Sequence, residues 1–448
     1  MFSQTYKWLH LSRRVSSAGT TISGTVNKFL PRSTQDVASP ESWLSFSGQS
    51  TWMPCSSGNF TPPMVKLRSF SALTIRRQKV VILGAGYAGT AAASRLDKWF
   101  KERVELTLVD SRDVMLHKFG AVRGIVYGDK FTHRLVIPQD KLMQYGKVVH
   151  GQVETVTDAK VIFRDGKELE YDYLVAATGS RNKLAEPPSN ITSADGIMAH
   201  WNRMAEEIKK AQKITLIGGG PVSVELAGEI RDRYGDGKQV NIITSENSVL
   251  WNNPPFVASF YRKINEQLKN LGVTVFTGER VEVPFDTDNP LLVGERNIPL
   301  IDGQAVESDL VINGTGSVLN TSMYPDSWKC EKGKLRVQST LQVSGKDNVF
   351  AVGDINNVLE TKLGVLASFQ AIVAAKNIVR LEEKKALKTY KPSKPVMLLP
   401  IGRELGAVAF PWFSLGPFFP RMVKGKNVFV DFQWKNMNQR SSLQPELK

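Results

Sequence analysis

The amino-acid sequence predicts an α/β protein with two Rossmann-like dinucleotide-binding domains and a small C-terminal α+β region. A glycine-rich turn occurs twice, at Gly84–Gly89 (GAGYAG) and at Gly218–Ser223 (GGGPVS). Each turn follows a short apolar strand and opens a helical pattern, which is the arrangement that binds the pyrophosphate of a dinucleotide. A later apolar strand, Asn348–Val352, ends in Gly353 and Asp354. Two dinucleotides on one polypeptide indicate that electrons pass from one to the other.

The first glycine turn has every feature of the fingerprint. Gly84 permits the tight turn, Gly86 lets the backbone approach a pyrophosphate, and Gly89 lets the following helix pack close to the sheet. The pyrophosphate then lies on the unpaired N–H groups at the helix N-terminus. A second strand, Val104–Val109, leads to Asp110, 21 residues after Gly89. A carboxylate at that spacing is typical of a ribose-binding acid.

The second glycine turn is less regular. Ser223 stands where the third glycine is expected, and the next strand, Val240–Ile243, leads to Glu246. Glu246 could hold the ribose of NAD and would repel the 2′-phosphate of NADP. Because Lys238 and Arg233 are close in sequence, both NADH and NADPH stay open as substrates.

Two further strand ends resemble each other. Tyr173–Ala177 runs into Thr178-Gly179-Ser180, and Ser308–Asn313 runs into Gly314-Thr315-Gly316. Such small-residue turns let the backbone approach a cofactor. Asp354 could accept a hydrogen bond from a ribityl hydroxyl of a flavin, and the helix after it would then point at the flavin ring. An N-cap of that helix is the alternative role.

These signals predict five segments along the chain. They are a basic extension (1–77), the first part of an FAD-binding domain (78–190), an NAD(P)H-binding domain (191–314), the second part of the FAD-binding domain (315–385), and a C-terminal domain (386–448).

The positive charge is unevenly distributed. The chain carries a net charge of +15, of which +7 lies in residues 1–77. The rest is only mildly basic, so nucleic-acid binding has little support. The extension is basic, rich in serine and poor in acids, which is typical of a transit peptide and predicts a mitochondrial protein; a plastid or the cytoplasmic face of a membrane is the alternative. Phe2 excludes N-myristoylation, which requires glycine there.

The cysteine and histidine content excludes several redox classes. Cys55 and Cys330 are the two cysteines, and no C-x-x-C or C-x₄-C pair exists. An internal dithiol relay and an iron–sulfur cluster are therefore excluded. The five histidines lack the spacing of metal ligands, so we expect no metal. No apolar run reaches the length of a transmembrane helix, about 18 residues.

Residues 386–448 combine aromatic and basic side chains. Trp412-Phe413 and Phe418-Phe419 precede Arg421 and Lys424. This composition suits a membrane interface or an apolar substrate channel. A small core that covers the flavin is an equally good interpretation.

Together these motifs resemble the two-dinucleotide flavoproteins of glutathione-reductase-like fold. Within them the chain is most similar to the apoptosis-inducing-factor-2-like, or ferroptosis suppressor protein, group, which is related to the type II NADH:quinone reductases. The resemblance rests on the second glycine turn with Val224-Glu225, and on Ala176–Ser180, Val349–Asp354 and Phe429–Met437. It implies FAD in the first half, NAD(P)H in the second half, and a quinone as acceptor.

The resemblance also implies roles for individual residues. Those that would hold FAD are Gly84, Gly86, Gly89, Asp110, Arg123, Thr178, Gly179 and Asp354. Those that would line the nicotinamide nucleotide are Gly218, Gly220, Ser223, Glu246 and Gly316. Three residues would act in catalysis: Glu225 would bond the nicotinamide ribose or carboxamide, Lys362 would stabilise reduced flavin, and Lys424 would lie on the quinone side.

Other activities fit parts of the same pattern. A type II respiratory NADH dehydrogenase shares the chemistry, and a monodehydroascorbate- or ferredoxin-reductase type would use another acceptor. An NADH-sensing interaction protein is the alternative from a different class. We expect a quinone or another small electron acceptor as partner, with peripheral membrane contact and a homodimer as further expectations.

Overall fold

The computed structural model describes residues 76–251, 255–286, 288–425 and 427–439. These residues belong to one unit, Thr74–Lys448. Residues 1–75 of the expected targeting extension, with Cys55, lie outside the described residues.

The first sheet is parallel and carries the first glycine turn. Its five strands lie in the order β17-β9-β1-β2-β5. Their bounds are β1 Gln78–Leu83, β2 Val104–Asp110, β5 Lys147–His150, β9 Tyr173–Ala176 and β17 Val349–Ala351. Alternate residues of β1 enter two different cores: Val80 and Ile82 pack under helices, whereas Val81 and Leu83 pack under a second, small sheet. Burial on both faces explains why β1 is apolar throughout.

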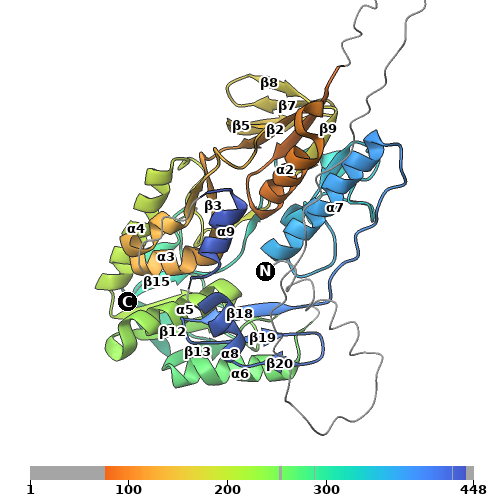
Figure 1. The fold of residues 1–448 in the computed structure, drawn as a ribbon. Coiled ribbons are helices and arrows are strands. Elements are labelled where there is room, and N and C mark those ends of the chain that lie inside the picture. The colour runs from red at the N-terminus through yellow and green to blue at the C-terminus, as the bar shows by residue number, and fades with distance from the viewer. Residues whose placement is uncertain (1–75, 252–254, 287, 426, 440–448) are drawn as a thin grey trace, which may run out of the picture. The chain divides into compact units, whose positions relative to one another are not determined.

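Two helices lie side by side over one face of this sheet. They are α2 (Tyr87–Phe100), which starts at the glycine turn, and α7 (Gly364–Glu382), which comes from much later in the chain (Figure 1). The opposite face is covered by β6 (Val153–Val156), β7 (Lys160–Phe163) and β8 (Glu168–Glu170). Among the described residues, α7 has the length and hydropathy of a membrane span, but 44% of that window is buried. It packs as a core helix does.

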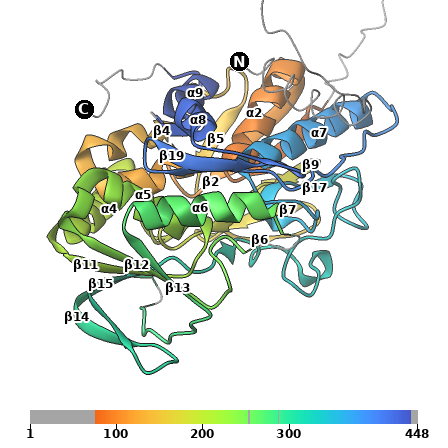
Figure 2. The ribbon, with the colours of Figure 1, turned by 90° about the horizontal axis from the view of Figure 1, so that it is seen from below.

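The second sheet repeats the plan of the first. Its order is β13-β12-β11-β15-β14, with β14 antiparallel at the outer edge (Figure 2). The strands are β11 Lys213–Ile217, β12 Gln239–Thr244, β13 Val273–Thr277, β14 Leu291–Pro299 and β15 Ala305–Asn313. The helices of this half are α4 (Ala194–Lys210), α5 (Pro221–Tyr234) and α6 (Ala258–Asn270). The predicted α/β fold with two Rossmann-like halves is confirmed.

The C-terminal region is a small antiparallel sheet with short helical turns. It comprises β18 (Met397–Ile401), β19 (Leu405–Ala409), β20 (Ser414–Leu415), α8 (Phe418–Pro420), the π-helical turn η9 (Arg421–Gly425) and α9 (Val430–Asn436). β18 packs on α5, where a Cβ at Gly228 would lie 2.6 Å from Ile401 Cγ2. The region therefore shares its core with the second half as well as covering the first.

Shorter elements connect these layers. They are β3 (Val114–Leu116), the turn η3 (Lys118–Gly120), α3 (Ala121–Tyr127), β4 (Val136–Pro138), and the antiparallel pair β10 (Ser180–Arg181) and β16 (Val318–Leu319), with further single 3-10 turns at Lys101–Arg103, Gly128–Lys130, Thr132–Arg134, Gly235–Gly237, Asp326–Trp328 and Gly353–Ile355.

Candidate cofactor and electron-transfer site

The first glycine turn is shaped by two steric constraints and leaves one open position. Gly84 has φ of +97°, and a Cβ on it would lie 2.6 Å from the Ala177 carbonyl oxygen. A Cβ on Gly89 would lie 1.7 Å from the carbonyl oxygen of Gly84, so only glycine lets α2 approach β1 this closely. Nothing lies within 4 Å of a Cβ on Gly86, which is the N-cap of α2 and has no side-chain cap. This open N-terminus fits a pyrophosphate.

Asp110 braces the same turn. Its Oδ2 accepts a hydrogen bond from Ala85 N–H at 2.5 Å, and its Oδ1 accepts from Arg112 N–H at 2.8 Å. A carboxylate has about four acceptor positions, so a ribose hydroxyl can still bind. Asp110 thus lies where the sequence predicted a ribose acid, and it also fixes the turn.

The two later flavin signals meet beside this turn. Ser180 donates its hydroxyl to Asp354 Oδ2 at 2.6 Å, across 174 residues of sequence. Thr178 donates its hydroxyl to the Asn320 carbonyl at 2.6 Å, and Gly179 has φ of +64°. Both segments follow strands of the first sheet, β9 and β17, and ligands of such sheets bind at the carboxyl ends of the strands. The contact between Ser180 and Asp354 was not predicted, since sequence spacing does not show it.

Lys362 lies in the loop between the Gly353–Asp354 turn and α7. Its Nζ donates to the Asn356 carbonyl and to Asn356 Oδ1, each at 3.0 Å. Burial lowers the pKa of Lys362 to about 8; Lys334 adds to the effect, and Asp354 and Glu360 oppose it. The ammonium group therefore loses its proton not far above neutral pH.

This pKa leads to a prediction for turnover against pH. If the Lys362 charge stabilises the electron-rich reduced cofactor, turnover should fall as pH rises through about 8, because the charged form of a lysine exists below its pKa. Lys362→Met should be slow and lack this step, whereas Lys362→Arg should stay active above it. Steady-state rates across the pH range test this; a step at about 8 that persists in Lys362→Met would contradict it.

A buried hydrogen-bond chain supports the same turn from behind. Gln370 Oε1 accepts from Gly353 N–H at 2.8 Å and from Asn356 Nδ2 at 2.6 Å. Gln370 Nε2 donates to Glu360 Oε1 at 2.6 Å, and Tyr390 also donates its hydroxyl to Glu360 at 2.9 Å. The sequence did not assign roles to Glu360 or Tyr390, because their partners lie 10 or more residues away.

The second glycine turn reproduces the geometry of the first. Gly218 has φ of +99°, and nothing lies within 4 Å of a Cβ on Gly220, the N-cap of α5. Glu225 lies half-buried in the second turn of α5, and Glu246 is exposed just after β12. Gly316 has φ of +69°, and its carbonyl accepts from Asn182 Nδ2 at 3.0 Å. This open N-terminus fits the second dinucleotide.

Gly86 and Gly220 form a matched pair for a second prediction. Both have φ near −75° and extended ψ, so alanine fits the backbone, and no atom would obstruct its Cβ. Gly86→Ala should therefore leave folding intact and lower the bound FAD. Gly220→Ala should keep FAD and weaken NAD(P)H binding about tenfold or more, because the methyl group enters the space of the pyrophosphate.

FAD content by visible absorbance and NAD(P)H affinity by titration check both variants. Gly237→Ala is the substitution control, because Gly237 is exposed, has no positive φ, and has no atom within 4 Å of an added Cβ. Loss of folding in Gly86→Ala, or equal effects of both variants on FAD, would argue against the assignment of the two turns.

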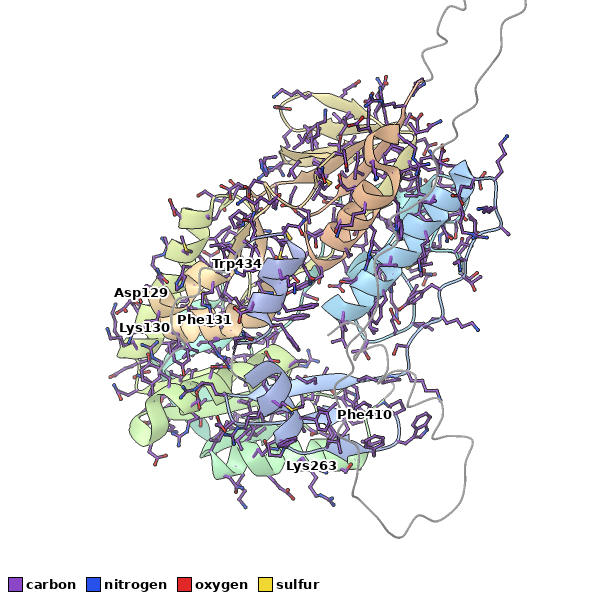
Figure 3. The ribbon with its side chains drawn as sticks, viewed as in Figure 1. Asp129, Lys130, Phe131, Lys263, Phe410 and Trp434 are labelled. Carbon is purple, nitrogen blue, oxygen red and sulfur yellow. The ribbon has the colours of Figure 1, made fainter. Side chains whose placement is uncertain are left out.

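Arg123, which the resemblance assigned to FAD, is buried in contacts within the protein. Its guanidinium is 0% exposed and pairs with Glu229 of α5, with Nη2 to Oε1 at 2.7 Å. Its Nη1 donates to the Gly425 carbonyl at 2.8 Å, and the guanidinium lies 5.8 Å from the centre of the Phe131 ring. Figure 3 shows Phe131 close to Trp434 of α9, whose Nε1 donates to the Arg134 carbonyl at 2.9 Å. Arg123 thus joins the two halves and the C-terminal region, and the implied contact with FAD stays a prediction.

Two other residues were expected at the site, Lys424 on the quinone side and Ser223 in the second glycine turn. Lys424 lies in the turn Arg421–Gly425, and its side chain is outside what the structure describes. Ser223 is fully buried and faces Gly314, where a Cβ would lie 1.9 Å from Ser223 Oγ. Among the residues described, no three His, Cys, Asp or Glu side chains form a metal site.

The comparisons with known proteins agree with this geometry. A family model described as pyridine nucleotide-disulphide oxidoreductase matches residues 78–375. The chain belongs to this family. Its resemblance to the apoptosis-inducing-factor and ferroptosis suppressor group is confirmed by three relatives. It is 31% identical to apoptosis-inducing factor homolog B of Dictyostelium discoideum, over 82% of this chain and 98% of the relative. It is 33% and 31% identical to ferroptosis suppressor protein 1 of Xenopus tropicalis and Homo sapiens, over 81% and 80% of this chain and 96% of each relative.

Solved structures of other family members share the fold. The sulfide:quinone oxidoreductase of Aquifex aeolicus superposes with a TM-score of 0.64 at 17% identity, over 81% of this chain and 92% of that one. NDH2 of Plasmodium falciparum in complex with NADH superposes with a TM-score of 0.61 at 16% identity, over 81% and 96%. As a member of the pyridine nucleotide-disulphide oxidoreductases, the protein is a flavoprotein oxidoreductase that uses FAD with NAD(P)H. When bound, FAD would supply the two-electron redox chemistry.

Proposed function

We propose that this oxidoreductase passes electrons from NADH through FAD to a quinone, without a redox disulfide. The observation that carries the quinone is a half-buried, stacked aromatic pair beside the flavin segments: the Tyr87 ring stacks on the Phe119 ring, with centroids 4.5 Å apart and an angle of 18°. Both rings lie against Gly364, the first residue of α7. Cys330 is a free cysteine, and no second thiol is spaced to form a dithiol with it. This supports direct transfer to an external acceptor.

The preference for NADH is supported by the partners of two basic residues. Lys238 is buried, and its Nζ donates to the carbonyls of Lys209 and Ala211. The Arg233 guanidinium lies over the rings of Tyr127 and Tyr234, at 5.1 and 5.0 Å. Both cations are thus engaged within the protein, while Glu246 is exposed at the end of β12, where it would repel a 2′-phosphate.

Anaerobic rapid mixing tests this function. NADH should bleach the flavin absorbance faster than NADPH, and a ubiquinone or menaquinone analogue should then restore it. A bound flavin that neither nucleotide bleaches would rule out the proposal. Reduced flavin that reacts with no quinone would rule out the acceptor alone.

We further propose that the C-terminal surface contacts a membrane, where a quinone resides. Trp412, Phe413, Phe418 and Met422 are 58, 49, 70 and 62% exposed. Lys394 Nζ lies 4.4 Å from the centre of the Trp412 ring. Nearby, Lys263 of α6 donates to Ser414 Oγ at 3.1 Å, and Figure 3 shows Phe410 in the same part of the molecule. Exposed aromatic groups beside cations suit an anionic lipid surface.

Removing two of these aromatic groups should weaken membrane binding. Trp412→Ser with Phe418→Ser is expected to lower binding to anionic vesicles about tenfold or more, because apolar area buried in the interface is lost. Ile301→Ser, at a 73% exposed site in the loop between β14 and β15, is the matched control. Co-sedimentation is the measurement, and equal binding of all three proteins would exclude this surface.

Mitochondrial import by the basic extension and a homodimeric state complete the proposal. Import into isolated mitochondria with cleavage of the extension, compared with import into plastids, tests the first. Light scattering of the purified protein tests the second.

A further inference from the structure

A tyrosine and a histidine form a hydrogen-bonded pair next to the first glycine turn. Tyr87 Oη lies 3.2 Å from His117 Nδ1, and His117 Nε2 lies 2.6 Å from the Val428 carbonyl oxygen. Because a carbonyl oxygen only accepts, Nε2 must carry the hydrogen. In the neutral imidazole, Nδ1 is then the bare nitrogen and accepts the Tyr87 hydroxyl. Phe119 N–H donates to Tyr87 Oη at 3.2 Å, so the hydroxyl is held from two sides.

The surroundings bury the histidine of this pair, whereas Tyr87 is half-buried. His117 is 1% exposed, its own N–H donates to the Leu135 carbonyl at 2.8 Å, and its ring meets Phe119 edge-on at 5.8 Å. Charged groups next to the pair are Lys118 and Glu186, which lie 2.8 Å apart. Burial is the main cause that raises the pKa of Tyr87, and Glu186 adds to it. The tyrosine hydroxyl therefore stays protonated at physiological pH.

The pair lies where two flavin-binding segments meet. Tyr87 follows Gly86 directly, and the Ser368 hydroxyl of α7 donates to its carbonyl oxygen at 3.2 Å. A Cβ on Gly364 would lie 2.6 Å from Tyr87 Cδ2 and 2.8 Å from Phe119 Cζ. The N-termini of α2 and α7 thus converge on this tyrosine.

We propose that Tyr87 donates a proton to the reduced quinone and that His117 restores the proton to Tyr87. This inference rests on the proposed function. The overall reaction consumes one proton: NAD(P)H, H⁺ and quinone give NAD(P)⁺ and hydroquinone. Once the quinone has received two electrons and one hydrogen, one of its two oxygens is an anion. That oxygen gains the Tyr87 hydroxyl proton while the Nδ1 proton of the His117 imidazolium passes to Tyr87 Oη.

The proton transfer returns His117 to the tautomer that the structure shows. After the transfer, His117 is neutral, with its hydrogen on Nε2 and a bare Nδ1, as the bond to Val428 requires. It regains a proton from solvent before the next cycle. Tyr87 is thus the donor, and His117 is a positioning residue that acts through it.

Two acceptors separate proton delivery from electron delivery. In the full-length, FAD-loaded protein, Tyr87→Phe should slow reduction of a ubiquinone analogue about 100-fold, the size typical of a lost general acid. Reduction of ferricyanide, which takes electrons without protons, should change far less. His117→Gln should likewise slow reduction of the quinone far more than reduction of ferricyanide. Tyr171→Phe, which loses a hydroxyl bonded to the Thr157 carbonyl at 2.5 Å, is the matched control.

A spectroscopic measurement tests the pair apart from turnover. The chain has five histidines, so the nitrogen resonances of His117 can be assigned by their loss in His117→Gln. The neutral Nε2–H tautomer is expected, with an Nδ1 resonance that shifts in Tyr87→Phe and not in Tyr171→Phe. The opposite tautomer, or equal loss of quinone and ferricyanide reduction in Tyr87→Phe, would overturn the inference. A wild-type protein that reduces ferricyanide and no quinone would overturn the proposed function and this role with it.

Discussion

Glu229→Ala is expected to lower the free energy of unfolding by about 3–5 kcal/mol, because it removes the carboxylate that balances a buried arginine charge. Arg123 reaches both carboxylate oxygens of Glu229, at 2.7 to 3.0 Å, and neither side chain is more than 4% exposed. Burial raises the pKa of Glu229, and the adjacent guanidinium of Arg123 opposes this effect. Chemical denaturation is the measurement.

Replacing both partners should be much less harmful than replacing one. Arg123→Met with Glu229→Leu removes both charges and keeps similar volume, so most of the lost stability should return. Asp165→Ala breaks an exposed ion pair, in which Asp165 Oδ2 lies 2.8 Å from Lys167 Nζ. This change should leave the midpoint of unfolding unchanged. If Glu229→Ala behaved like Asp165→Ala, the buried pair would not stabilise the fold. The double variant also tests whether this ion pair keeps the two halves aligned. If it does, flavin reduction by NADH should slow in the double variant without loss of FAD.

The sequence predicted the two nucleotide-binding halves because their information is local. Each glycine turn, its strand and its helix lie within about 30 residues, the length of a βαβ unit. Element boundaries depend on single residues that change the backbone: Gly151 and Gln152 separate β5 from β6. A Cβ on Gly151 would lie 2.7 Å from the Phe163 ring, so this glycine permits a close turn.

The sequence could not predict the partners that the fold brings together. Arg123 and Glu229 are 106 residues apart, and Ser180 and Asp354 are 174 apart. A resemblance transfers the position of such a residue but not its contacts within the protein, so the pairing of Arg123 with Glu229 was not predicted. β14 was also not expected, because its Gly294 and its exposed residues weaken the apolar pattern of a strand.

Gly314→Ala is expected to destabilise the second half by about 1–3 kcal/mol, the cost typical of overpacking, and to weaken NAD(P)H binding. The new Cβ would lie 1.9 Å from Ser223 Oγ and 3.2 Å from Ser223 Cβ. Ser223 is 0% exposed, so turning its hydroxyl away only moves it into packed surroundings. The helix α5 must then shift, and its N-terminus with Gly220 shifts too. Denaturation and nucleotide titration report the two effects.

The first half explains how this loss can be reversed. There the contact between helix α2 and the end of strand β9 is made by Gly89 on the helix and Ala177 after the strand. The Ala177 Cβ would lie 3.6 Å from a Cβ on Gly89. In the second half the small residue is on the opposite side: the helix carries Ser223 and the strand end carries Gly314. In the first half glycine is required mainly by the Gly84 carbonyl oxygen, which would lie 1.7 Å from a Cβ on Gly89. In the second half the serine is tolerated because Gly314 faces it.

Ser223→Gly combined with Gly314→Ala should restore stability and NAD(P)H binding, since it recreates the pairing of Gly89 with Ala177. The remaining contact of the new Cβ is the Ile217 carbonyl oxygen at 3.2 Å, which needs an adjustment of only a few tenths of an ångström. Ser223→Gly alone should be nearly neutral, because it removes a buried hydroxyl for which the described residues provide no hydrogen-bond partner. If the double variant were as unstable as Gly314→Ala, the contact between α5 and the end of β15 would not determine which residue can stand at position 223.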